Sequence, residues 1–213
     1  AFNSEPQNAL IPGDTNETGG GKVGQLLFAN LVRYDSKGDT KMEVADSIEP
    51  NKDATQYTVK LKDGWKFTDG TPVTAESFTK SWSYTANAKN AQKCSSFFSM
   101  IKGYDDLQKD GLKGDEQLEG LKVVDDKTFT VDLAQPDSVF PIKVGYLAFA
   151  PLPESFYKDP KAFGEKPVGN GMYKLDKWDH NSQIVLTKNA DYKGEEKPKN
   201  DGVTFKIYTD VDA

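Results

Sequence analysis

The chain has 213 residues, of which 36% are apolar, 28% charged and 11% aromatic. This composition supports a packed core and excludes a wholly disordered chain, while the net charge of −6 argues against a nucleic-acid partner, because phosphate binding needs clustered Lys and Arg. No apolar run reaches the roughly 18 residues of a membrane-spanning helix, and the longest, Val139 to Leu152, is interrupted by two prolines, a lysine and a glycine.

The sequence does not begin with Met and shows no signal peptide, so it has the form of a mature or trimmed segment. Its single cysteine, Cys94, cannot form an internal disulfide. Because no Cys or His lies near it in the sequence, we interpret Cys94 as a small apolar core residue and not as a reactive thiol.

The first third of the chain predicts a loop, a helix and a strand pair. Residues 3–21 are rich in Asn, Pro, Gly and Thr and predict an irregular loop. Apolar residues at helical spacing predict a helix from Lys22 to Val32. Strict alternation predicts a half-buried strand from Gln56 to Lys62, and the Asp63-Gly64 turn predicts a return strand over Trp65–Phe67.

A second helix is predicted after Pro72, with Thr74 as its N-cap. Phe78 and Trp82 are four residues apart and therefore share one face of this helix. In the preceding segment Trp65 and Phe67 alternate with Lys66, so both can pack against this face of the helix. We expect one buried aromatic cluster formed by Trp65, Phe67, Phe78 and Trp82.

The rest of the chain is predicted to be mainly strands with one further helix. Residues 103–120 form a polar stretch rich in Lys, Asp and Gly. The other predicted elements are a hairpin of 121–124 with 128–133, a helix over 138–147, a hairpin of 172–178 with 183–187, and a strand over 203–207. Helices and strands mix without a regular βαβ rhythm, so the fold class is α+β (mixed α/β) with mainly antiparallel pairing.

Two local features raise the question of a phosphate-binding loop and of a metal site, and neither has the residues that such a site needs. Gly19-Gly20-Gly21-Lys22 precedes a helix, but a phosphate-binding loop needs Gly where Asn16 stands and Ser or Thr where Val23 stands. We interpret these glycines as a flexible entry to the helix. The only histidine, His180, has no second His or Cys for a metal site, and we interpret it as a solvated residue at a hairpin tip.

Catalytic residues are not indicated by any sequence pattern. No Gly-x-Ser-x-Gly elbow is present. Adjacent acidic residues such as Asp105-Asp106 and Asp125-Asp126 point apart and make poor acid–base partners. We therefore expect no enzyme activity, no metal and no cofactor, although a hydrolase whose two carboxylates meet only in the fold stays an open alternative.

Four blocks in order resemble the peptide/nickel-binding family of extracellular solute-binding proteins. The strongest is residues 57–78, YTVKLKDGWKFTDGTPVTAESF, followed by Ser81-Trp82. It is similar to the family's "G-x-K-F" return, "D-G-x-P-V-T-A-x-D" turn and helix with "S-W". The other blocks are LFANLVRYD (27–35), PVGNGMYKL (167–175) and LTKNADYKG (186–194).

This resemblance implies a two-lobed receptor that closes on its ligand. By analogy, residues 1–43 and 167–213 would form a discontinuous, incomplete first ligand-binding lobe, and residues 44–166 an inserted, mainly antiparallel helper domain. The second ligand lobe would be absent from this chain. The wall of the ligand cavity would come from the loop 3–16 and the turn 169–172, so the resemblance implies as ligand-binding residues Asn3, Glu5, Gln7, Asn16, Gly169 and Asn170.

The function implied is the substrate-binding component of an ABC importer. It would capture peptides, chiefly oligopeptides, outside the cell or in the periplasm and deliver them to the membrane permease. The resemblance also implies a monomer, held at the cell surface by a lipid anchor not present in this chain. The alternatives are a member of the same fold that has lost its cargo and serves as a scaffold, and a binder of nickel chelates or oligosaccharides.

Overall fold

The computed structural model describes residues 1–208. Its strands are β1 (Phe2–Asn3), β2 (Val32–Tyr34), β3 (Thr40–Met42), β4 (Ala45–Pro50), β5 (Gln56–Leu61), β6 (Leu121–Asp125), β7 (Thr128–Asp132), β8 (Tyr173–Asp179), β9 (Gln183–Lys188) and β10 (Gly202–Ile207). Its helices are α1 (Thr18–Leu27), α2 (Ala75–Ala86), α3 (Phe140–Lys143), α4 (Glu154–Lys158) and α5 (Pro160–Glu165). This mixture, with mainly antiparallel pairing, confirms the predicted α+β class.

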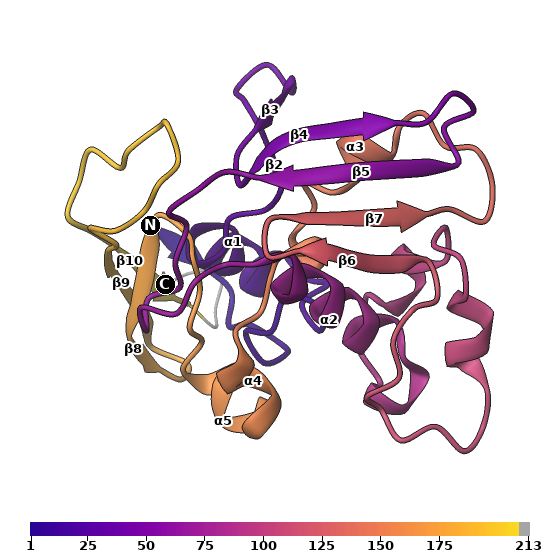
Figure 1. The fold of residues 1–213 in the computed structure, drawn as a ribbon. Coiled ribbons are helices and arrows are strands. Elements are labelled where there is room, and N and C mark those ends of the chain that lie inside the picture. The colour runs from indigo at the N-terminus through magenta and orange to yellow at the C-terminus, as the bar shows by residue number, and fades with distance from the viewer. Residues whose placement is uncertain (209–213) are drawn as a thin grey trace.

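One four-stranded sheet, in the order β1-β10-β9-β8, joins the two ends of the described chain (Figure 1). β1 is parallel to β10, and the amide of Lys206 donates to the carbonyl of Ala1 at 2.8 Å. The predicted hairpin of β8 and β9 and the predicted last strand are confirmed. Residues 209–213, the end of the predicted first lobe, lie outside the described residues.

A second four-stranded sheet has the order β4-β5-β7-β6, and the predicted β6–β7 hairpin is confirmed. β5 pairs with β4 on one side and with β7 on the other. Both edges of β5 are therefore occupied, and the predicted return strand over Trp65–Phe67 is wrong. That segment makes only an isolated bridge, between Lys66 and Pro72.

Helix α2 packs against the second sheet and carries the centre of its core (Figure 1). Thr74 caps the helix as predicted, and its side chain exchanges capping contacts with Ser77. The indole N–H of Trp82 donates to the carbonyl of Phe149 at 2.8 Å. The predicted aromatic cluster is confirmed, since each member is at most 2% exposed within one core: Trp65, Phe67, Phe78 and Trp82.

Helix α1 begins four residues before its predicted start and ends five residues before its predicted end. The Glu17 carboxylate caps it by accepting from the amide of Gly20 at 2.8 Å. The three glycines therefore lie inside the first turns, so their interpretation as a flexible entry is wrong. Phe28 is extended, with φ −124° and ψ 140°, because the chain turns there toward β2.

The helix predicted over residues 138–147 is also wrong in length. Only Phe140–Lys143 is α-helical, and a 3₁₀ helix follows at Leu147–Phe149. Gly145 separates the two, and a side chain there would meet the ring of Tyr34 at 2.7 Å. The polar stretch 103–120 likewise contains a 3₁₀ helix, at Tyr104–Gln108.

Two hydrophobic cores hold these elements together. The first contains the second sheet and α2 and also takes in Leu31, Val32 and Tyr192. The second joins α1 and the first sheet to α4 and α5 through residues such as Phe156 and Phe163. Within residues 1–208, no helix has the length and apolar character needed to span a membrane.

Candidate functional site

Two adjoining pockets run along the exposed side of α1 and share Gln25 in their walls. The first, of about 250 Å³, we call the loop pocket; it is lined by Thr15, Asn16, Glu17, Thr18, Gly21, Lys22, Gln25, Tyr146 and Leu147. The second, of about 330 Å³, we call the acidic pocket; it is lined by Gln25, Phe28, Ala29, Asn30, Val32, Arg33, Tyr34, Glu43, Gly145, Gly171, Met172, Tyr192 and Glu196.

The loop that forms the rim of the loop pocket is fastened at several points. The Thr15 hydroxyl donates to the carbonyl of Ile11 at 2.8 Å, and the amide of Leu10 donates to the carbonyl of Gly164 at 3.0 Å. The amide of Cys94 donates to the carbonyl of Gly13 at 2.9 Å. These bonds hold the loop against α5 and against the segment after α2, so the rim is built before any ligand arrives.

Among the predicted site residues of the N-terminal loop, Asn16 lines the loop pocket with an exposed side chain. Gln7 is also exposed. Asn3 is only 7% exposed, and its side-chain amide donates to the carbonyl of Gly19 at 2.9 Å. Asn3 therefore ties β1 to the start of α1, and the structure separates it from the open surface where Asn16 lies.

Glu5 is engaged by the β8–β9 hairpin. Its Oε1 accepts from the indole N–H of Trp178 at 3.1 Å and lies 2.8 Å from Nδ1 of His180. Its Oε2 accepts from the amide of Asn181 at 3.0 Å. The other ring nitrogen of His180 lies 2.9 Å from Oε2 of Glu165. His180 thus lies exposed in the turn between β8 and β9, as interpreted from the sequence. The sequence did not indicate that its ring bridges two carboxylates.

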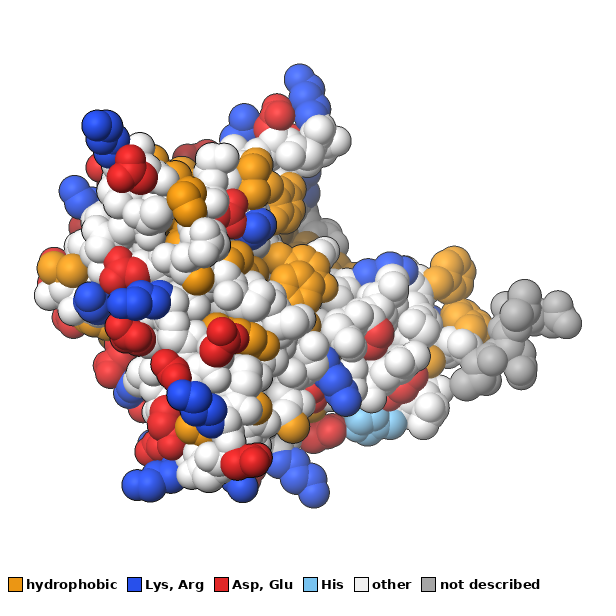
Figure 2. Space-filling view, turned by 90° about the vertical axis from the view of Figure 1, so that its right-hand side faces the viewer, with side chains coloured by type: hydrophobic (Ala, Val, Ile, Leu, Met, Phe, Trp, Pro, Cys, Tyr) orange, Lys and Arg blue, Asp and Glu red, His pale blue; other side chains and the backbone are white. Residues whose placement is uncertain are grey.

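Both carboxylates raise the pKa of His180 above its ordinary value, the bond to Glu5 being the larger cause. Figure 2 shows this histidine, in pale blue, at the surface beside an acidic side chain. The face drawn in Figure 2 otherwise mixes acidic and basic side chains and shows no basic stripe.

Gly169 and Asn170 are buried and join the turn before β8 to the end of α1. The carboxamide of Asn170 accepts from the amide of Ala29 at 2.9 Å and donates to the carbonyl of Ala29 at 3.0 Å. A Cβ at Gly169 would lie 1.9 Å from the carbonyl oxygen of Leu27. Of the predicted turn 169–172, the residues that line a pocket are Gly171 and Met172.

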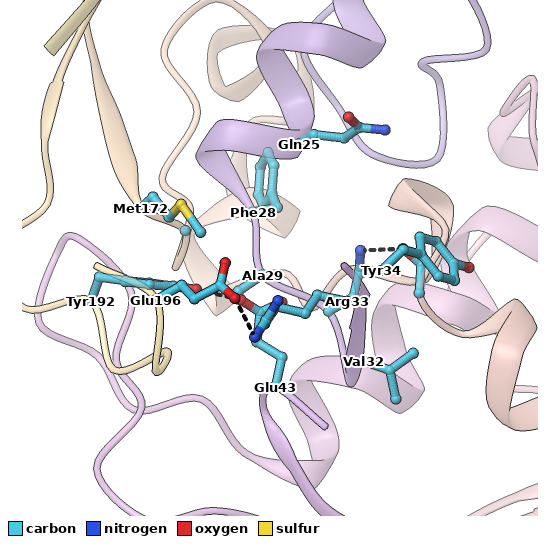
Figure 3. A pocket seen from close by; sticks show the side chains of 13 residues that line it. Gln25, Phe28, Ala29, Val32, Arg33, Tyr34, Glu43, Met172, Tyr192 and Glu196 are labelled. Carbon is cyan, nitrogen blue, oxygen red and sulfur yellow. Dashed lines mark hydrogen bonds and ion pairs between the residues drawn. The ribbon is translucent and has the colours of Figure 1, made fainter. Parts of the chain in front are cut away.

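The acidic pocket gathers charged groups that no sequence motif had indicated. Figure 3 shows Arg33, Glu43 and Glu196 turned toward one another, with Met172 nearby. Arg33 pairs with Glu196 at 3.0 Å. The Tyr192 hydroxyl donates to Oε1 of Glu43. These residues come from β2, from the segment before β4 and from the loop after β9, so only the fold brings them together.

Burial sets the electrostatics of this pocket. Glu43 is 8% exposed, and desolvation raises the pKa of its carboxyl above the ordinary value, although the Tyr192 hydroxyl and Arg33 oppose this. Burial and the neighbouring Glu43 raise the pKa of Tyr192 as well. The pocket thus holds a carboxylate that a positively charged or hydrogen-bond-donating group would stabilise.

The described residues carry little that would serve covalent or metal chemistry. No group of three or more His, Cys, Asp or Glu residues within 1–208 could hold a metal ion. Cys94 is fully buried, and burial raises the pKa of its thiol to about 11, so the thiol stays protonated near neutral pH. This burial confirms its interpretation as a core residue.

Comparison with solved structures places the fold among peptide-binding receptors of bacteria. The Haemophilus influenzae OppA complex with RPPGFSPFR superposes with a TM-score of 0.89 at 28% identity, covering 97% of this chain and 41% of that one. The unliganded open form of MppA, a periplasmic murein tripeptide binding protein, gives a TM-score of 0.88 at 26% identity, covering 97% and 40%. The architecture is therefore that of a periplasmic solute-binding protein, as the sequence predicts.

The chain belongs to family 5 of the bacterial extracellular solute-binding proteins, whose middle region it matches over residues 39–213. It is 35% identical over 191 residues to the periplasmic oligopeptide-binding protein OppA of Salmonella typhimurium, covering 86% of this chain and 34% of the relative. It is 30% identical over 195 residues to the oligopeptide-binding protein OppA of Bacillus subtilis, covering 90% and 35%. The chain thus spans about a third of the length of these relatives.

Proposed function

We propose that this chain is part of the substrate-binding component of an ABC importer, which captures peptides outside the cell and delivers them to the membrane permease. The observation that carries the proposal is the superposition, at a TM-score of 0.89, on a receptor bound to RPPGFSPFR. The family match and the relatives named as oligopeptide-binding proteins support it.

The wall of the peptide cavity is proposed to be the loop 3–16, the loop pocket and the turn 169–172. Asn16 and Gln7 have exposed side chains that could meet a ligand. Glu5, Asn3 and Asn170 are engaged by protein groups. We assign these three, with Gly169, to holding the wall in shape. An extended peptide would then bind chiefly through its backbone, as an added strand does.

We also propose the division into domains that the family resemblance implies: a first lobe of residues 1–43 with 167–213, and a helper domain of residues 44–166. It places the β4-β5-β7-β6 sheet wholly in the inserted helper domain and the β1-β10-β9-β8 sheet wholly in the first lobe. Because the relatives are more than twice as long, we propose that a second lobe, from the rest of a longer chain, encloses the ligand.

A role in binding, without catalysis, fits the relatives, which are named as binding proteins. The periplasmic or extracellular setting named for the family supports a location outside the cytoplasm. The permease as partner, the lipid anchor and the monomeric state are proposed by analogy. The second candidates are a scaffold without cargo and a binder of another solute; relatives named as glutathione-binding proteins, 30% identical over 202 residues, keep the choice of small peptide open.

Mass spectrometry of ligand that co-purifies with the full-length parent protein tests the proposal. We expect a set of short peptides that is released on denaturation and absent from an unrelated control protein prepared in the same way. A parent protein that carries no peptide, and whose melting temperature no peptide mixture raises, would favour the scaffold. Turnover of generic ester, glycoside or peptide substrates would favour a hydrolase.

A further inference from the structure

The acidic pocket contains a buried hydrogen-bond acceptor without a donor. Asn30 is 8% exposed, and its Nδ2 donates to the carbonyl of Gly145 at 3.1 Å. This bond fixes the orientation of the carboxamide, because the carbonyl of Gly145 can only accept. Oδ1 of Asn30 is left without a hydrogen-bond partner among residues 1–208. A buried acceptor in this state costs stability until a donor reaches it.

The same pocket contains a buried carboxylate, Glu43, that makes no direct ion pair among residues 1–208. Glu43 receives the Tyr192 hydroxyl on Oε1 but forms no ion pair within the described part of the chain. Two cations, Arg33 and Lys62, are near enough to lower the pKa of Glu43, but Arg33 pairs with Glu196 at 3.0 Å. Two carboxylates face one guanidinium, so the pocket carries a formal charge of −1 when both acids are ionised. A buried carboxylate without a cation is unfavourable.

The rest of the lining fits the stem of an organic ligand. Phe28 and Met172 line the pocket beside the charged groups, as Figure 3 shows. The volume of about 330 Å³ is enough for a short alkyl chain ending in a charged group. A metal ion fits less well, because no group of three or more His, Cys, Asp or Glu within residues 1–208 could hold one and Arg33 already lies beside both acids.

We propose that the acidic pocket binds a small organic cation, an alkylammonium or guanidinium group, which donates to Oδ1 of Asn30 and to the carboxylate of Glu43. Phe28 and Met172 would contact its apolar stem. The cation could be a free small molecule or the basic side chain of a bound peptide. The inference does not depend on peptide capture, because a free cation is sufficient to occupy the pocket.

Protonation of Glu43 gives the site a second measurable property. Since burial raises the pKa of this carboxyl, a bound cation would favour the ionised form and lower that pKa. Binding at a pH where part of the Glu43 population is protonated would therefore release protons. Calorimetry in two buffers of different ionisation enthalpy detects this release.

The test is calorimetric titration of the 213-residue chain with L-arginine and with L-citrulline, its neutral counterpart of nearly equal shape. We expect arginine to bind and citrulline to bind at least about tenfold more weakly, as loss of a charge-assisted contact predicts. Glu43→Gln should weaken arginine binding at least about tenfold. Glu196→Gln at the rim should weaken it less, and the distant Glu119→Gln should leave it unchanged.

Two tripeptides, Ala-Arg-Ala and Ala-citrulline-Ala, separate the two sources of the cation. Binding of Ala-Arg-Ala without binding of free arginine would identify a cargo side chain, and comparable binding of both would identify a free cation. If arginine and citrulline bind equally, or no arginine compound binds, the proposal is wrong. Because the ligand pair decides this with the unaltered chain, a Glu43→Gln variant that fails to fold does not weaken the test. Peptides without basic residues test peptide capture separately.

Discussion

A single carboxamide, that of Asn170, joins the turn before β8 to the end of α1 with the same two bonds that a neighbouring strand would make. It replaces the pairing that the Ala29 backbone lacks in a region without a strand. The family resemblance implies a ligand-binding role for this residue, whereas its carboxamide in the structure serves the scaffold. A polar residue in a loop thus does not reveal whether its partner is a ligand or the backbone.

We predict that Asn170→Ala lowers the free energy of unfolding by about 2–4 kcal/mol, because two buried backbone groups of Ala29 lose their partners. Asn16→Ala is the matched control. Its side chain is exposed on the loop pocket, so its effect on stability should stay within about 0.5 kcal/mol. Urea denaturation of both variants measures the difference. Equal destabilisation by the two changes would contradict the assigned role of Asn170.

His180 gives the chain a pH-dependent contact between three segments. Its ring faces Glu5 on the N-terminal loop, Glu165 on α5 and the Trp178 ring on β8, whose centroid lies 4.2 Å away. The pKa of His180 is raised above the ordinary 6.5 in the folded state. The stabilisation is therefore fully present below the unfolded pKa and is lost as pH rises through the folded one.

We predict that wild-type chain melts above the His180→Gln variant at about pH 5.5 and that this gap shrinks by about pH 9. The side chain of His180 is 50% exposed, so solvent screening keeps the effect modest. Thermal melts of the two proteins across this range measure it. A gap that is constant, or that widens with rising pH, would show that the ion pairs with Glu5 and Glu165 do not form.

At the scale of elements, alternation and capping located α2 and the strands from β5 to β10, because these patterns act over a few neighbouring residues. The hairpins β6–β7 and β8–β9 and the cap at Thr74 were therefore predictable. The start of α1 was not, because Glu is an unusual cap and three glycines normally weaken a helix. The pairing of β5 with β7 was not predictable either, because β7 lies about 70 residues away along the chain.

Two glycines, Gly21 inside α1 and Gly169 packed against its C-terminal end, respond differently to substitution. Gly21 is inside the helix, and a Cβ there would meet nothing within 4 Å. Gly21→Ala should therefore stabilise the chain by about 0.5–1 kcal/mol through helix propensity. Gly169→Ala should destabilise it strongly, because its Cβ would lie 1.9 Å from the Leu27 carbonyl oxygen. Thermal melts measure both changes. A Gly21→Ala change that does not stabilise the chain would contradict the helical start at Thr18, and a neutral Gly169→Ala change would contradict the close packing on Leu27.

Helix α2 and the second sheet depend on Trp82. Its ring makes edge contacts with Phe78 and Phe129 and is fully buried. We predict that Trp82→Ala costs about 3–5 kcal/mol, measured by denaturant unfolding. On the same helix, Glu76→Ala removes an exposed ion pair with Lys80 and should cost under about 0.5 kcal/mol. A small effect at Trp82 would mean that the core is loosely packed.

At the scale of the whole molecule, the candidate site is a wall and not an enclosure. The loop pocket and the acidic pocket both open along one side of α1. Sequence blocks led to the family because they encode turns and core contacts that recur at fixed spacing. They did not lead to Arg33, Glu43 and Glu196, since these meet only after the segments around β2, β4 and β9 have packed.

We predict that this chain alone binds peptide poorly or not at all. Micromolar affinity requires about 8 kcal/mol of net binding free energy, and cleft receptors obtain it by enclosing most of the ligand surface. A peptide on one wall stays half in water, so each hydrogen bond gains only about 1 kcal/mol, while association and ordering oppose binding.

Calorimetry with a pool of peptides without basic residues, run on this chain and on its full-length parent, measures the difference. The parent should bind at least about a hundredfold more tightly, which corresponds to about 2.7 kcal/mol. The comparison is sound only if this chain is folded, which a cooperative thermal transition would establish beforehand. Equal affinities would place the whole site within these residues, and the proposed second lobe would then have no part in holding the ligand.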